Sequence, residues 1–122
     1  MAAAEQESIR HFFAGKSTHT TDLFNHLVAE FEKLGAVKLE ATKSMIAIDN
    51  GTKRIAWVTQ LGKNFVHVVF PFHQPFEDNL CFSKIGQVPG SRQFNHHLRL
   101  YHKSDVNHEV RGYMQLALTG AV

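Results

Sequence analysis

Apolar and polar residues recur with two different periods along the chain, and each period predicts one kind of element. Near the N-terminus, apolar residues follow a helical spacing ahead of Gly15, which predicts a short helix that ends there. A second helix is predicted to begin at Thr20 or Thr21 and to end at Gly35. The apolar residues of the two helices are Ile9, Phe12 and Phe13, then Phe24, Leu27, Val28, Phe31 and Leu34.

From Val37 onwards the period changes to two, as in strands that bury one face. Asn50-Gly51 is a strong signal for a two-residue hairpin, and Gly62-Lys63 predicts another tight turn. Strands are predicted over residues 37–42, 45–48, 54–60, 64–70, 81–88 and 94–101. Pro71 is expected to end regular pairing after the fourth strand. The short connections predict an antiparallel meander of five to six strands.

A last helix is predicted from Asp105, as its cap, to Gly120. Its apolar face consists of Val106, Val110, Tyr113, Met114 and Ala117. The elements together predict an α+β fold, with two N-terminal helices, the sheet, and a C-terminal helix packed on one sheet face. The 122 residues are expected to form a single domain, 1–122.

Composition narrows the function classes. The net charge is only +2 and the basic residues are spread along the chain, which does not by itself indicate nucleic-acid binding. The single cysteine, Cys81, excludes an intrachain disulfide and favours a reducing compartment. The sequence has neither a secretory signal pattern nor an apolar run long enough for a membrane span. We therefore expect a cytoplasmic protein without a membrane partner.

The strand over residues 94–101 carries the most suggestive polar side chains. His97, Arg99 and Tyr101 alternate with the apolar positions, so they are expected on one face, while His96 belongs to the buried face. An arginine offers a planar fork of donors that suits carboxylate or phosphate. This face is therefore a candidate site for a small anionic ligand. The alternative is an ordinary solvated face with scattered polar residues.

Lys43 and Ser44 follow the first strand and extend the candidate ligand-binding set. A lysine and a hydroxyl in a loop suit an anion, although an ordinary turn is the simpler interpretation. Neither a metal nor a cofactor is expected, because the histidines and Cys81 lack the spacing of a known metal site. Trp57 on an uncovered sheet face would favour a homodimer through that face.

Three segments resemble a known family. They are residues 12–17 (Phe-Phe-Ala-Gly-Lys-Ser), 43–47 (Lys-Ser-Met-Ile-Ala) and 94–100 (Phe-Asn-His-His-Leu-Arg-Leu), with Asp105 opening the last helix. In these the chain resembles the small bacterial family called domain of unknown function 5655. The resemblance implies no reaction. It points to Lys43, Ser44, His97 and Arg99, and the association of some relatives with restriction-type or nuclease-type domains implies an accessory role near nucleic acid.

The leading hypothesis from the sequence is a ligand- or anion-binding module that uses the basic and histidine-bearing face of the last strand. One alternative is an accessory nucleic-acid-associated domain of restriction or nuclease systems. Another is a small enzyme with His97 as general acid or base. A carboxylate beside His97 in a closed pocket would favour the enzyme, and an open, wet sheet face would favour the binding module.

Overall fold

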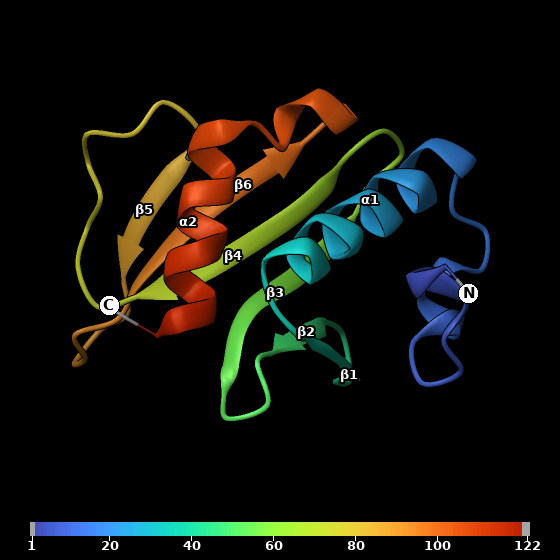
Figure 1. Cartoon of the computed structure of the whole chain (residues 1–122), viewed down its shortest axis with the longest axis horizontal. Helices are drawn as coiled ribbons and strands as arrows, with labels where there is room; N and C mark the ends of the chain where they lie inside the picture. The colour runs from blue at the N-terminus through green and yellow to red at the C-terminus, as the bar shows by residue number, and fades with distance from the viewer. Residues whose placement is uncertain (1, 121–122) are drawn as a thin grey trace.

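The computed structural model describes residues 2–120 and shows a six-stranded antiparallel sheet with two α-helices on one of its faces (Figure 1). The α+β class predicted from the sequence is confirmed. The strands are β1 (Lys38–Ala41), β2 (Ile46–Asp49), β3 (Arg54–Leu61), β4 (Val66–Phe72), β5 (Lys84–Gln87) and β6 (Phe94–Leu100). The helices are α1 (Thr18–Leu34) and α2 (His108–Thr119), and short 3-10 turns are η1 (Ala3–Glu5), η2 (Arg10–Phe13) and η3 (Lys103–Asp105).

The segment before α1 forms 3-10 turns rather than the α-helix that its spacing predicts. Ile9 is fully buried, so the apolar positions do pack, but η2 covers only residues 10–13 before Gly15 turns the chain. So short a segment gains too few hydrogen bonds to offset the cost of starting an α-helix.

Helix α1 begins at Thr18, two residues before the predicted start, because Ser17 supplies its cap. The Ser17 hydroxyl oxygen accepts a hydrogen bond from the Thr20 backbone N–H at 3.1 Å. The same hydroxyl donates to the carbonyl oxygen of Lys63 at 2.8 Å. The cap therefore also attaches the start of α1 to the turn between β3 and β4.

The strand order departs from a simple meander at one place. Strands β1 to β4 lie in sequence order, but β6 pairs with β4 and leaves β5 at the edge, giving β1-β2-β3-β4-β6-β5. Strand β6 matches β4 over seven residue pairs, including Pro71 with Asn95, so pairing continues past the proline to Phe72. Strand β5 is short and none of its four residues is buried, as is usual for an edge strand. The longer, better buried β6 thus takes the inner position.

Helix α2 is capped by Asn107, and not by Asp105 as the sequence predicts. The Asn107 side-chain oxygen accepts a hydrogen bond from the Val110 N–H at 3.0 Å, and Gly120 ends the helix at a positive φ of 67°. Asp105 lies one turn earlier, in η3, where its carboxylate accepts hydrogen bonds from the backbone N–H groups of Tyr101 and His102. It fixes the end of β6 instead.

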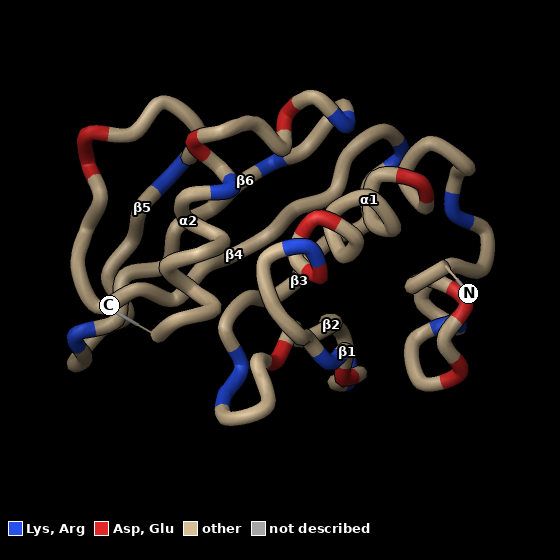
Figure 2. The backbone as a smooth tube through the Cα atoms, viewed as in Figure 1, with Lys and Arg blue, Asp and Glu red and all other residues tan. Residues whose placement is uncertain are grey.

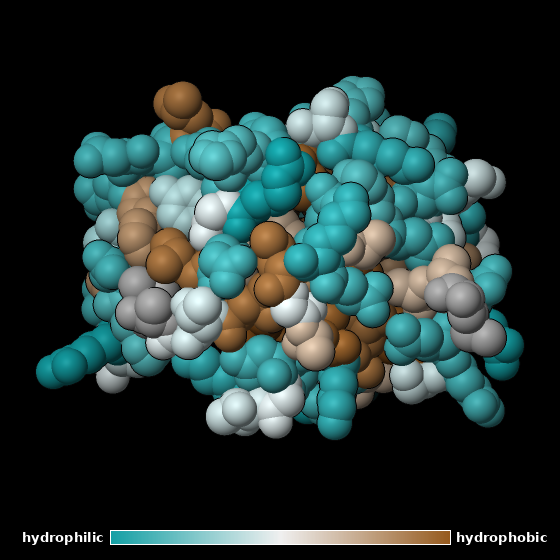
Figure 3. Space-filling model, viewed as in Figure 1, coloured by the Kyte–Doolittle hydropathy of each residue, from teal (hydrophilic) through white to brown (hydrophobic). Residues whose placement is uncertain are grey.

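The core lies between the helices and one face of the sheet. Its largest fully buried side chains include Phe24, Phe31, Phe70, Leu100 and Met114. On the helix side, the surface is mostly polar, with apolar side chains visible between α1 and α2 (Figure 3). Basic residues are spread over the whole backbone and include positions on β5 and β6 (Figure 2). No helix within residues 2–120 has the length and apolar character needed to cross a membrane.

Candidate anion site on the open sheet face

The last strand divides its side chains between the two sheet faces as predicted. His96, Leu98 and Leu100 are buried toward the helices, whereas His97 is half-buried and Arg99 is exposed. The strand register shows which residues of the other strands lie on the same face as His97 and Arg99, because directly paired residues share a face. Trp57 of β3, Val69 of β4, His97 of β6 and Lys84 of β5 form one such row.

A neighbouring row brings His67 of β4 opposite Arg99, and the three polar side chains form a hydrogen-bonded chain. Arg99 Nε donates to His67 Nδ1 at 3.1 Å. His67 Nε2 lies 2.9 Å from His97 Nδ1. Because a guanidinium only donates, His67 Nδ1 is an acceptor and its proton is on Nε2. That proton is donated to His97 Nδ1, so neutral His97 carries its own proton on Nε2. This Nε2–H group is a donor that the Arg99–His67–His97 hydrogen bonds leave free.

An aromatic pair supports the guanidinium. The Arg99 Cζ atom lies 4.5 Å from the centre of the Phe65 ring, and the Phe65 and Tyr101 rings are 5.8 Å apart. The backbone of Tyr101 is fixed on both sides, since its N–H donates to Asp105 and its carbonyl oxygen lies 2.6 Å from His19 Nε2. A cation stacked on an aromatic ring keeps most of its donors available. Arg99 therefore has a defined position and spare N–H groups.

The charges around the two imidazoles are positive. The pKa of His67 is lowered by burial, and further by His97 and Arg99. The pKa of His97 is lowered by burial, then by Lys84, which is opposite it in the register, and by His96. No carboxylate hydrogen-bonds to either imidazole within residues 2–120. The site consists of neutral imidazoles between two cations and has no counter-ion from these residues.

The structure brings only part of the predicted ligand-binding set together. His97 and Arg99 share the site, and Tyr101 lies at its edge through its contact with Phe65. Lys43 and Ser44 form the two-residue turn between β1 and β2, and strands β3 and β4 separate β2 from β6. Ser44 instead lines a separate pocket beside β3. Lys84 occupies the flanking position that Lys43 was expected to take.

His67, Lys84 and Phe65 were not in the predicted set. The hydrogen-bond partners of His67 are the site residues His97 and Arg99. The missing information was the register between β4 and β6, which puts His67 opposite Arg99. No local pattern around either residue contains that register.

A metal site on or near the sheet would have to draw its ligands from His67, His73, His96, His97 and Cys81. Across residues 2–120, no three His, Cys, Asp or Glu side chains come close enough together to hold a metal ion. His96 is fully buried, where its Nδ1 donates to the Phe94 carbonyl at 2.8 Å and its Nε2 accepts from the Phe76 N–H at 3.1 Å. Both of its nitrogens are thus used, Nδ1 within β6 and Nε2 in holding the segment after β4.

A comparison with known protein families matches residues 9–117 to the family described as Domain of unknown function (DUF5655). The chain belongs to that family. The match runs from just before η2 to the last turn of α2, so it includes the whole sheet and every residue of the candidate site, and the resemblance seen in the sequence is confirmed. Comparisons with curated proteins and with solved structures give no match. Membership in DUF5655 names no activity, so function has to be argued from the site.

Proposed function

We propose that this DUF5655 domain binds an anionic group, a phosphate or a carboxylate, on its open sheet face through Arg99 and His97. The observation that carries the proposal is the chain from Arg99 through His67 to His97. It orients one imidazole N–H and leaves guanidinium donors beside it, with no acidic side chain hydrogen-bonded to the imidazoles within residues 2–120. Such prearranged donors favour an acceptor-only anion.

Lys84 supports the same proposal as a flanking cation. It is exposed, pairs with His97 across β5 and β6, and makes no ion pair with residues 2–120. By contrast, Arg54 on β3 also stacks over an aromatic ring of this face, Trp57, but is paired with Glu40 at 3.3 Å. The β5–β6 side is therefore the part of the face with unneutralised positive charge.

Binding is favoured over catalysis by what surrounds His97. A general acid or base at this position would normally be oriented by a carboxylate, and the partner of His97 is a second imidazole. Its lowered pKa also keeps it neutral at pH 7, as an N–H donor. These features suit recognition of an anion more than proton transfer to a substrate.

The test is a titration with inorganic phosphate and with acetate, followed by NMR of the backbone and imidazole resonances. We expect shifts centred on His97 and Arg99. Arg99→Met should weaken binding by about tenfold or more, because a charge-assisted contact is lost. Arg54→Met is the matched control, an exposed arginine over an aromatic ring on the same face, and it should bind as the wild type does. Lys43→Met should also leave binding unchanged.

Equal binding by the wild type and Arg99→Met, or loss of binding in Arg54→Met alone, would refute the proposal. The same variants titrated with a short DNA single strand test the nucleic-acid alternative, since phosphodiester contacts weaken steeply as salt rises. Binding of phosphate without salt-sensitive binding of DNA would leave the anion proposal standing and remove the nucleic-acid one.

A further inference from the structure

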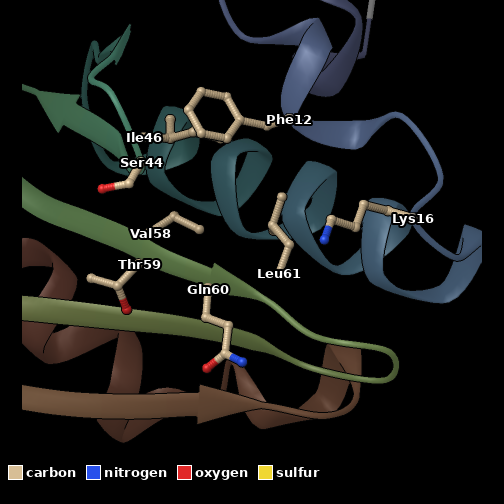
Figure 4. Close-up of a pocket in the computed structure, with 8 residues that line it drawn as sticks. All are labelled: Phe12, Lys16, Ser44, Ile46, Val58, Thr59, Gln60 and Leu61. Atoms are coloured by element: carbon tan, nitrogen blue, oxygen red, sulfur yellow. The ribbon is translucent and has the colours of Figure 1, made fainter.

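A cavity lies in the other half of the sheet, where β2 begins and β3 continues past it. The last residue pair between β2 and β3 at this end is Ile46 with Val58. The rest of β3, as far as Leu61, therefore has no neighbouring strand on its β2 side. The chain around Phe12 and Lys16 borders the space in place of a strand (Figure 4). The cavity has a volume of about 310 Å³, within the range of small-ligand sites.

The wall of this cavity is apolar on one side and polar on the other, where Ser44, Thr59 and Gln60 line it. Ile46 and Val58 are buried residues of its wall, and Phe12 and Leu61 are partly buried ones that pack against the core. In Figure 4 the ring of Phe12 lies beside Ile46, while the polar ends of Thr59 and Gln60 point away from Phe12 and Lys16. A ligand body placed against Phe12, Ile46 and Leu61 would therefore meet carbon, and an aromatic or short aliphatic group fits that part of the wall.

One end of the cavity carries a cation. The side chain of Lys16 extends toward Leu61 in Figure 4, and no Asp or Glu lines the cavity. Lys16 makes no ion pair with residues 2–120. Its backbone is held at the start of α1, since its N–H donates to the Phe13 carbonyl at 3.0 Å and the next residue, Ser17, caps the helix. The fixed backbone thus places the Lys16 side chain at the edge of the cavity.

We propose that this cavity binds a small carboxylic acid with an aromatic or short aliphatic body, the carboxylate at Lys16 and the body between Phe12, Ile46 and Leu61. The juxtaposition of an unpaired cation with an apolar wall selects a ligand that has both features. This site is separate from the Arg99–His67–His97 chain, because Ile46 is on β2, and β3 and β4 lie between β2 and β6. Either proposal stands or fails without the other.

The experiment is a titration of the full chain with benzoate and, in parallel, with benzyl alcohol, which has a similar shape and no charge. Methyl NMR of Ile46, Val58 and Leu61 reports binding in the cavity. We expect benzoate to shift these methyl signals at about millimolar concentration, as for a fragment-sized ligand, and benzyl alcohol to bind more weakly.

Variants separate the two parts of the ligand. Lys16→Met should weaken benzoate binding by roughly tenfold and leave benzyl alcohol unchanged, because only the ion contact is removed. Lys63→Met is the matched control, a lysine of the β3–β4 turn that lines the neighbouring groove but not this cavity, and it should bind benzoate normally. Phe12→Ala should weaken both ligands to a similar extent. Absence of methyl shifts, equal affinity for the two ligands, or an unchanged benzoate affinity in Lys16→Met would overturn the proposal.

Discussion

Arg99 decides which nitrogen of each neighbouring imidazole carries the proton. A lysine at this position would present a freely rotating ammonium, whereas the planar guanidinium donates to His67 Nδ1 in a fixed direction and thereby fixes the next hydrogen bond as well. Alternation along the last strand was enough to predict that His97 and Arg99 share a face. The role of His67 depends on a partner 32 residues away, so only the tertiary structure reveals it.

The tautomers give a prediction at this scale. At alkaline pH, nitrogen-15 NMR should find both His67 and His97 protonated on Nε2. His96 is the internal control and should be protonated on Nδ1, because that atom donates to the Phe94 carbonyl. A proton on Nδ1 of His97 would contradict the hydrogen-bonded chain.

At the scale of elements, α1 and α2 are joined by one buried carboxylate, Glu30. Its Oε1 accepts a hydrogen bond from Arg111 Nη1 at 3.1 Å, and its Oε2 lies 2.6 Å from Lys33 Nζ. The pKa of Glu30 is lowered, mainly by Lys33, with Arg111 contributing. Arg111 also donates to the Val106 carbonyl at 2.6 Å, so it connects α1 with the start of α2, whereas Lys33 only joins one turn of α1.

We expect Arg111→Met to lower the free energy of unfolding by about 1–2 kcal/mol, because a buried carboxylate loses a partner. Lys33→Met, the matched loss of a cation from the same carboxylate, should change it by only about 0.5 kcal/mol or less, since the Lys33 side chain is exposed. Urea unfolding of both variants provides the measurement. A larger effect for Lys33→Met would show that the link between the helices is unimportant.

Element boundaries show where local patterns suffice. The apolar stripe of α1 and the alternation of the strands are strong signals, and those elements form close to the predicted residues. The caps were harder to assign, since Ser17, Thr20 and Thr21 are all good cap residues, as are Asp105 and Asn107. The choice among them depends on the other hydrogen bonds that each side chain makes. The Ser17 hydroxyl also donates to the Lys63 carbonyl, whereas the Asp105 carboxylate already accepts a hydrogen bond from the Tyr101 N–H after β6.

At the scale of the whole molecule, the strand order could not be read from short connections. Local turns favour neighbours in sequence, and this holds for β1 to β4. The position of β6 depends instead on how much surface it buries beside β4 compared with β5, which is a property of the assembled sheet. The fold class was therefore predictable from residues and turns, and the exchange of β5 and β6 was not.

Stability of the whole domain should fall in mild acid. The pKa values of His67, His96 and His97 are all lowered in the folded protein, chiefly by burial. The unfolded chain, with histidine pKa values near 6.5, then binds more protons than the folded one. The free energy of unfolding is thus highest above about pH 6.5 and decreases as the pH falls toward the folded values.

Urea unfolding at pH values from 8 to 5 should show this decrease. His97→Gln should reduce its slope, because one of the three groups no longer titrates. His73→Gln is the control, since His73 is exposed and makes no hydrogen bond with residues 2–120, and it should leave the slope as in the wild type. Stability that rises between pH 7 and pH 5 would contradict the assignment of neutral buried imidazoles.

The inner position of β6 also has a consequence for the order of folding. Hairpins between consecutive strands can close β1 to β4 locally, but pairing β6 with β4 requires the 21 residues between Phe72 and Phe94 to form a closed loop first. Closing that loop costs conformational entropy before any contact between β4 and β6 can compensate for it. We therefore expect His67 to meet His97 and Arg99 late in folding, so that a nascent chain would complete the proposed anion site after most of the sheet already exists.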